Sequence, residues 1–437
     1  MTNRIIKLLT VLPLSFFIAA CAEPEDDSID NSGVNINATH QVLAFNDLGM
    51  HCADLDYSTF VILPPFNVVH SQVIERGAPP RILDDTQATV DYHAVQDGSG
   101  STNSTSQNQA GGVTKSNFWD YVFDLFGLDP QPDEGMAIDP AFSQAMPGIL
   151  NPYTANDPQP FKHFDNDKKW FAADGIPILP IDDAGQLNAY PLMRVSAAVS
   201  GENVANLDVV LPVASEADCQ NCHEMGQIGA SDGNIDYMPP PADATDTNAV
   251  LQAAKHNILV LHDNKHGTNL LNQKPVLCAS CHYSAALDLA GTGPTNTLPK
   301  MSEVMMSEVM HGHHGELTDS TGAPLFPTNG TLEETCYQCH PGKITKCLRG
   351  AMGGAGIDCV DCHGSMLAVG SSTREPWLDE PRCESCHTGE AVKNDGDIRL
   401  NQAWSDHVDV ATPRLASNKR FAENTSTLYR NSLGHGD

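Results

Sequence analysis

The chain has 437 residues, and its 24 basic and 55 acidic side chains give a formal charge of −31. Such acidity excludes nucleic acid as a partner, because phosphate groups would repel it, and favours basic partners. Aromatic residues make up only 6% of the chain, which is little bulk for the cores of the two or three domains that this length allows.

The N-terminus is typical of a protein that is exported. A charged start is followed by an apolar run over 8–20 that is too short to span a bilayer comfortably. Small residues precede Cys21, and this ending resembles the lipobox of bacterial lipoproteins, in which the cysteine is acylated. We expect a signal peptide over 1–20 and a flexible tether over 21–37. The alternatives are an ordinary secretory signal and a short N-terminal anchor. The resemblance, with alanine at position 22, implies a lipid anchor in the outer membrane.

Residues 38–215 predict a β-rich, sandwich-like domain. Apolar runs and alternation of apolar with polar residues predict its strands. These strands are expected at 60–63, 68–74, 88–94 and 206–213. A hairpin around an acidic turn is expected to join 176–181 to 192–199.

Between these strands, the sequence predicts a loop and a helix. The stretch 98–117 is rich in Gly, Ser, Thr, Asn and Gln, which predicts a flexible loop. A short amphipathic helix is expected over 117–126. Further along the chain, 246–261 and 301–310 also have helical periodicity.

Ten of the 13 cysteines fall into five copies of one motif, C-x-x-C-H. Two thiols three residues apart can form thioethers to one porphyrin, and the following imidazole can bind its iron. Zinc and redox sites also use C-x-x-C, but five copies, all followed by histidine, fit neither. We therefore predict five covalently attached haem c groups. Their attachment and proximal residues are Cys219, Cys222 and His223; Cys278, Cys281 and His282; Cys336, Cys339 and His340; Cys359, Cys362 and His363; and Cys383, Cys386 and His387.

A low-spin haem also needs a second axial ligand. Five of the 18 histidines belong to the motifs, and others lie close to them in sequence. The candidates for the distal position are His256, His262, His266, His311 and His314. Methionines in 301–310 are alternative ligands, although helical methionine more often fills a core. The sequence leaves the pairing of each histidine with an iron open.

With these motifs over 219–387, the chain resembles the multihaem c-type cytochromes of anaerobic and metal-respiring bacteria. The segments 46–52 and 62–67 also resemble an N-terminal signature of large cytochromes of this kind. The resemblance implies that 216–437 is a haem-packed domain of short helices and long loops, whereas 38–215 carries no haem. It also implies electron transfer through the five haems in anaerobic or extracellular respiration. The implied partners are other redox proteins or cytochromes and an extracellular electron acceptor.

Two cysteines, Cys52 and Cys347, remain once the others have roles. In an oxidising compartment such a pair predicts a disulfide, which would join the two domains. Two buried free thiols, or thiolate ligands of iron, are the alternatives.

Two other functions compete with electron transfer. One is a reductase that resembles the pentahaem nitrite reductases, although their C-x-x-C-K motif is absent here. The other is a cytochrome whose β domain binds a surface or forms filaments. We favour an electron-transfer protein over an enzyme. The ending Gly434-His435-Gly436 resembles sequences that precede a further haem motif, so we also expect that the chain is a fragment or has lost a sixth haem.

Overall fold

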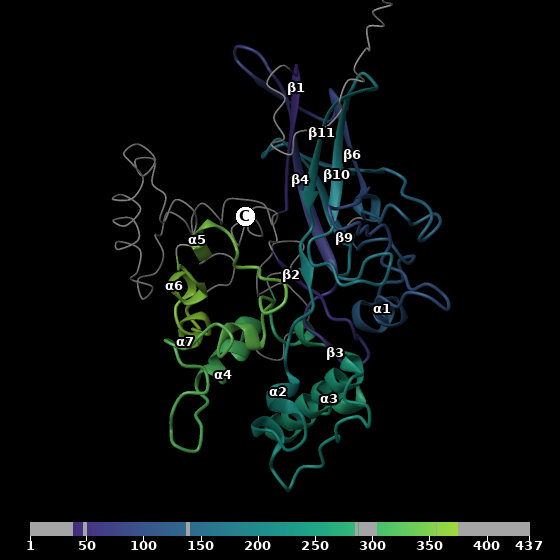
Figure 1. Cartoon of the computed structure of the whole chain (residues 1–437). Helices are drawn as coiled ribbons and strands as arrows, with labels where there is room; N and C mark the ends of the chain where they lie inside the picture. The colour runs from purple at the N-terminus through teal and green to yellow at the C-terminus, as the bar shows by residue number, and fades with distance from the viewer. Residues whose placement is uncertain are drawn as a thin grey trace, which may run out of the picture. The chain divides into compact units, whose positions relative to one another are not determined.

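The computed structural model of the chain describes residues 38–46, 50–136, 140–284, 287, 304–354 and 356–374 (Figure 1). The predicted signal peptide, tether and C-terminal ending lie outside the described residues, and so do Cys21 and the fifth motif with Cys383, Cys386 and His387.

One antiparallel sheet is built around the longest strand, β4. Its strand order is β1-β4-β9-β8, and β5 also pairs with β4. The strands are β1 (His40–Phe45), β4 (Phe66–Glu75), β5 (Arg81–Leu83), β8 (His163–Asp165) and β9 (Trp170–Pro177). The expected strand at 68–74 is therefore confirmed and slightly longer than predicted.

A second antiparallel sheet has the order β11-β10-β6-β7. Its strands are β6 (Ala88–Val95), β7 (Gln159–Pro160), β10 (Leu192–Val199) and β11 (Glu202–Val210). Strands β10 and β11 are joined through Ser200 and Gly201, whose φ angles of 54° and 85° suit a two-residue hairpin turn. In β6, buried residues alternate with more exposed ones, as the sequence predicted.

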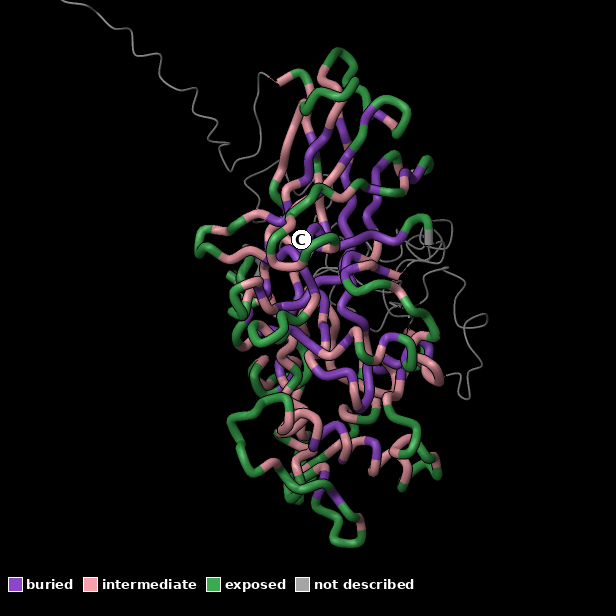
Figure 2. The backbone as a smooth tube through the Cα atoms, turned by 90° about the vertical axis from the view of Figure 1, so that its right-hand side faces the viewer, coloured by how far each residue is buried: buried purple, intermediate pink, exposed green. Residues whose placement is uncertain are grey.

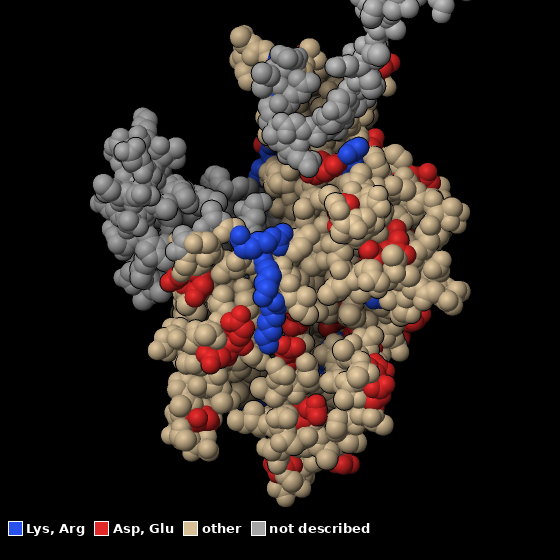
Figure 3. Space-filling model, viewed as in Figure 1, with Lys and Arg blue, Asp and Glu red and all other residues tan. Residues whose placement is uncertain are grey.

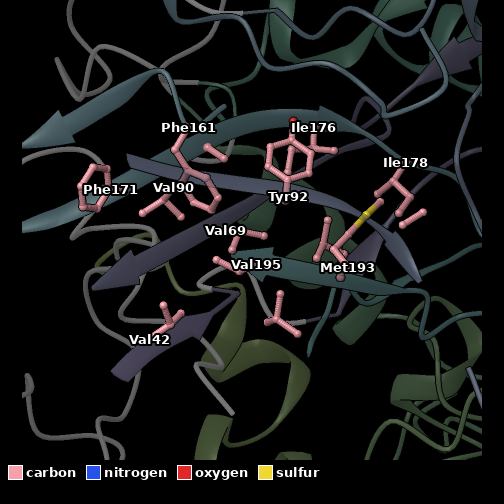
Figure 4. Packing of buried hydrophobic residues seen from close by; sticks show 14 of the residues in the cluster. Val42, Val69, Val90, Tyr92, Phe161, Phe171, Ile176, Ile178, Met193 and Val195 are labelled. Carbon is pink, nitrogen blue, oxygen red and sulfur yellow. The ribbon is translucent and has the colours of Figure 1, made fainter. Parts of the chain in front are cut away.

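The two sheets share one buried hydrophobic cluster. Val69 and Phe171 come from the first sheet, and Tyr92 and Val195 from the second (Figure 4). The β-rich character of the N-terminal half is thus confirmed, with two sheets that bury their apolar faces together.

The predicted hairpin between 176–181 and 192–199 is wrong. Strand β9 pairs with β4 and β8, whereas β10 belongs to the other sheet. The acidic turn is closed locally instead, because the Asp182 carboxylate accepts hydrogen bonds from the backbone N–H groups of Ala184 and Gln186 at 2.9 and 2.7 Å. After this turn the chain leaves the first sheet, and its next strand, β10, belongs to the second sheet.

The polar stretch 98–117 is a loop, as its composition predicted, but part of it is buried. Thr105 and Ser106 are buried, and their hydroxyls donate to the buried Asp133 carboxylate at 2.5 and 2.6 Å. Lys115 is buried as well and donates to Asp183 at 2.8 Å. Hydrogen bonds to partners distant in sequence therefore hold this segment inside the fold.

Two helices follow the sequence closely. Helix α1 (Phe118–Phe126) buries Phe118, Val122 and Leu125 in a second cluster that includes Tyr57 and Leu277. Helix α3 (Thr247–His266) begins after Asp246, whose carboxylate accepts the Ala249 N–H, and it extends beyond the predicted end at 261. A left-handed Gly267 ends it.

Short parallel pairs connect the first half of the chain with the second. β2 (His51–Cys52) pairs with β12 (Val213–Ala214), and β3 (Phe60–Val61) pairs with β13 (Val276–Leu277). The other elements are brief: η1 (Pro140–Phe142), α2 (Gln220–His223), η2 (Ile228–Ala230), η3 (Leu270–Asn272), η4 (Cys278–Ser280), the π-helical η6 (Glu308–Gly312), α4 (His313–Gly315), η7 (Cys336–Gln338), α5 (Ala351–Gly354), α6 (Cys359–His363) and α7 (Met366–Val369).

Burial is unequal along the described chain. Residues 38–215 hold most of the buried residues, whereas exposed and half-buried positions dominate after residue 216 (Figure 2). A chain segment with so few buried residues has little hydrophobic core of its own.

Candidate functional site

Each of the four described C-x-x-C-H motifs forms a helical turn, in α2, η4, η7 or α6. In the first three motifs the backbone N–H of His223, His282 or His340 donates to the carbonyl of the first cysteine, at 2.8, 3.0 and 2.9 Å. Such a turn keeps the two cysteines of a motif one turn apart, which is the arrangement that attachment to one porphyrin requires.

The first and second motifs both lie near the ion pair between Lys255 and Asp54. Burial raises the pKa of Cys219 to about 11 and that of Cys278 to about 12, and both charges of the ion pair act on both thiols. The two motifs therefore begin close to the same buried pair.

The first and third motifs are joined by direct hydrogen bonds through Gln338. Its carbonyl accepts the Asp218 N–H at 2.9 Å, and its side-chain oxygen accepts from the Asn221 amide at 2.9 Å. Burial, followed by the charges of Cys219 and Cys222, raises the pKa of the Cys339 thiol to about 12. The first and third attachment sites thus lie side by side.

The third and fourth motifs also meet. Cys336 and Cys359 share a side-chain hydrogen bond, which lowers the pKa of Cys336 to about 6 and raises that of Cys359. A cavity of about 360 Å³ borders both motifs, and Tyr337 and Asp358 are among its lining residues. Its volume falls in the range of small-molecule and cofactor sites.

Two motif histidines face histidines from the 306–315 segment. The rings of His340 and His311 have centroids 5.9 Å apart and planes 11° apart. The rings of His223 and His314 are 6.4 Å apart at 84°. Because an imidazole nitrogen binds a metal at about 2 Å, two imidazoles on opposite sides of one iron have centroids about 6 Å apart. Both pairs therefore have the spacing of trans axial ligands.

Hydrogen bonds orient these rings further. The Nδ1 atoms of His311 and His314 lie 2.9 and 2.6 Å from the carbonyls of Ser307 and Met310. The Nδ1 of His282 lies 3.2 Å from the Val304 carbonyl. Since a carbonyl can only accept, each Nδ1 carries the proton, and Nε2 keeps a lone pair of the kind that binds metals.

The electrostatic environment of His223 favours its neutral form. Burial, followed by the charges of His314 and His313, lowers the pKa of His223 to about 4. A lowered pKa leaves the imidazole neutral at neutral pH, and only the neutral ring can bind a metal.

The other distal candidates lie on helix α3. The pKa of His262 is lowered by burial, by His266 and by His282, and this places His262 in the neighbourhood of the second motif. The ring of His266 is 4.9 Å from that of His262, too close for an iron between them. The Nδ1 of His256 is buried without a hydrogen-bond partner.

The structure contains no disulfide bond between Cys52 and Cys347, or between any other cysteines in the described part of the chain. Cys347 Sγ donates to the Pro341 carbonyl at 2.9 Å. Burial raises the pKa of Cys52 to about 12, with the charges of Asp54 and then Cys347 adding to the effect. Because each cysteine lies within electrostatic range of the other, the disulfide stays a prediction.

Two residues that connect parts of the site carry no recognisable signal in the sequence. Lys255 is buried beside the first two motifs, and nothing in its helix distinguishes it from a solvent-exposed lysine. Glu216 accepts backbone N–H groups of Gly342, Ile344 and Thr345 at 2.8, 3.1 and 2.7 Å. No pattern in the sequence identifies a contact between residues that are more than a hundred positions apart along the chain.

The residues present fit a haem better than a bare metal ion. Within the described ranges, no three His, Cys, Asp or Glu side chains converge on one point as a metal site. An iron in a porphyrin takes only two ligands from the protein, and each facing histidine pair supplies two.

Family models, curated proteins and solved structures gave no match to this chain. In the described part of the chain, none of the helices has the length and apolar character needed to cross a membrane.

Proposed function

We propose that this chain is an exported, lipid-anchored c-type cytochrome that transfers electrons through five covalently attached haems. The observation that carries the proposal is the presence of five C-x-x-C-H motifs within residues 219–387. The distribution of the hydrophobic core supports it. Among the described residues, the motif-bearing region contributes only Leu277 to the buried members of the two hydrophobic clusters. Porphyrins would supply the apolar volume that this region lacks.

The chain's own residues would provide attachment, ligation and an electrostatic environment. The motif thiols would hold each macrocycle, and the motif imidazoles would bind its iron. Haem held by these residues would supply a one-electron redox couple. On the face seen in Figure 3, one narrow stripe of basic side chains and a few scattered basic atoms lie among dispersed acidic ones, and the formal charge is −31. This charge favours redox partners with a basic docking surface, such as other cytochromes, or a cationic acceptor.

Intact-mass analysis of the full chain, produced in a host that matures c-type cytochromes, tests the proposal. The expected mass includes five haems and the acyl groups on Cys21. As a matched variant, Cys383→Ser with Cys386→Ser should lose one haem and keep the rest. A protein that carries no haem would overturn the proposal.

Spectroscopy then separates electron transfer from reduction chemistry. An electron-transfer protein should show six-coordinate, low-spin haems that do not bind nitrite. If the protein contains a high-spin haem that binds nitrite and reduces it, the function is that of a reductase and not electron transfer alone.

A further inference from the structure

We propose that one segment, residues 306–315, supplies the second axial ligand to two haems, His314 to the haem on the first motif and His311 to the haem on the third. The first and third haems would then be direct neighbours, although the second motif lies between them in sequence. This inference rests on the proposed function and adds to it the ligand pairs and the order of the haems.

The ring geometry identifies the pairs. The ring of His314 lies next to that of His223 and the ring of His311 next to that of His340, each at a centroid separation that leaves room for an intervening iron. In both cases the segment histidine donates its Nδ1–H to a carbonyl of its own helical turn. The remaining nitrogen, Nε2, is the one that binds iron when Nδ1 is held in this way.

The local structure explains how neighbouring histidines reach different motifs. In a regular α-helix, residues three positions apart lie on one face. Here the π-helical η6 precedes the short α4, and this wider turn changes the angle between His311 and His314. Each ring consequently meets a different motif histidine.

The contact between the two motifs supports the same order independently of the histidines. The hydrogen bonds of Gln338 to Asp218 and Asn221 join the third motif directly to the first. An ion pair between Lys343 and Asp218, at 2.5 Å, adds a second connection. Porphyrins attached at sites this close would be held next to each other.

The segment also contains a matched control. His313 is exposed, and its Nδ1 lies 3.4 Å from the Lys265 ammonium rather than facing a motif histidine across an iron-sized gap. The three histidines 311, 313 and 314 therefore differ in geometry while sharing one short stretch of chain.

The experiment compares His311→Ala, His313→Ala and His314→Ala in the holoprotein by electron paramagnetic resonance and optical spectroscopy. His311→Ala and His314→Ala should each convert one haem from low-spin to high-spin, without loss of haem mass. His313→Ala should leave the spectra unchanged. If an alanine variant fails to fold, His→Met at the same position should keep six-coordination and introduce a sulfur-to-iron charge-transfer band.

The lost signals should also differ in type. Near-parallel imidazole planes give a rhombic low-spin signal, and near-perpendicular planes give a highly anisotropic one with a large principal g value. His311→Ala should therefore remove a rhombic signal, and His314→Ala a highly anisotropic one, as follows from plane angles of 11° and 84°. His223→Ala should affect the same signal as His314→Ala.

Two results would overturn this inference while leaving the proposed function intact. One is a five-haem His314→Ala protein whose haems all remain low-spin. The other is a His223→Ala protein that loses a different signal from the one affected by His314→Ala. A wild-type protein without haem would instead remove the proposed function itself.

Discussion

Lys255 Nζ lies 2.8 Å from Asp54 Oδ1, so helix α3 is tied to the loop after β2 by a buried ion pair. The lysine side chain is 2% exposed and also donates to the carbonyls of Asp56 and Phe60, at 2.8 and 3.0 Å. A cation this buried must be paired and hydrogen-bonded, and the pair is consequently a strong constraint on where α3 can lie.

Replacing this lysine should therefore destabilise the protein. Lys255→Met leaves the Asp54 carboxylate without its cation, and we expect the free energy of unfolding to fall by about 3 kcal/mol. Denaturant titration of the holoprotein measures the effect. Lys265→Met, on an exposed position of the same helix, should change the stability by no more than about 0.5 kcal/mol. Equal effects of the two substitutions would show that the ion pair is not structurally important.

Gly370 is expected to control the position of the 306–315 segment. A Cβ atom at Gly370 would lie 2.2 Å from the backbone nitrogen of Gly312, and two backbones cannot relax as a flexible side chain can. Gly370→Ala should shift the segment and lower the free energy of unfolding by about 2 kcal/mol. In a fraction of the molecules, the haems on the first and third motifs should change from low-spin to high-spin. Gly350→Ala is the control, because a Cβ there meets nothing within 4 Å. Optical spectra that are identical for both variants would contradict this account of the glycine contact.

Glu216 should make the loop over 342–345 sensitive to acid. Burial alone would raise the pKa of Glu216, but hydrogen bonds from three backbone N–H groups lower it below the ordinary value of 4.5. The stabilisation is therefore present above pH 4.5 and is lost as the pH falls through the lower pKa of the folded state. The protection of the Gly342 and Thr345 amides against hydrogen exchange, relative to the intrinsic rate at each pH, should fall over that range. In the Glu216→Gln variant the same two amides should be less protected from exchange already at neutral pH. In the Glu202→Gln variant their protection should equal that of the wild type.

The accessibility of Cys52 and Cys347 tests the predicted disulfide. In the holoprotein the motif cysteines are blocked by haem, and without reductant iodoacetamide should modify neither Cys52 nor Cys347. After reduction, Cys52 should react slowly at about pH 8, because a pKa of about 12 leaves almost no thiolate. Peptide mapping measures both steps. Modification of both residues before reduction would show that they are free thiols.

Local chemistry and periodicity could be read directly from the chain. The alternation over β6, the amphipathic pattern of α1 and the Asp246 cap of α3 all follow from neighbouring residues. The helical turns at the described motifs did too, because two thiols and an imidazole at fixed spacing leave little choice of backbone. The expected hairpin between β9 and β10 failed because alternation marks a strand without naming its partner.

The sequence alone determined that there are five C-x-x-C-H motifs, and therefore how many haems the proposed function assigns to the chain. Only the tertiary structure brought His314 to His223 and His311 to His340, and buried Lys255 against Asp54. The physical reason is the distance along the chain over which each feature is determined. Attachment depends on atoms within one helical turn, whereas opposing ligands and buried ion pairs depend on which distant segments pack together, and spacing along the chain carries no record of that packing.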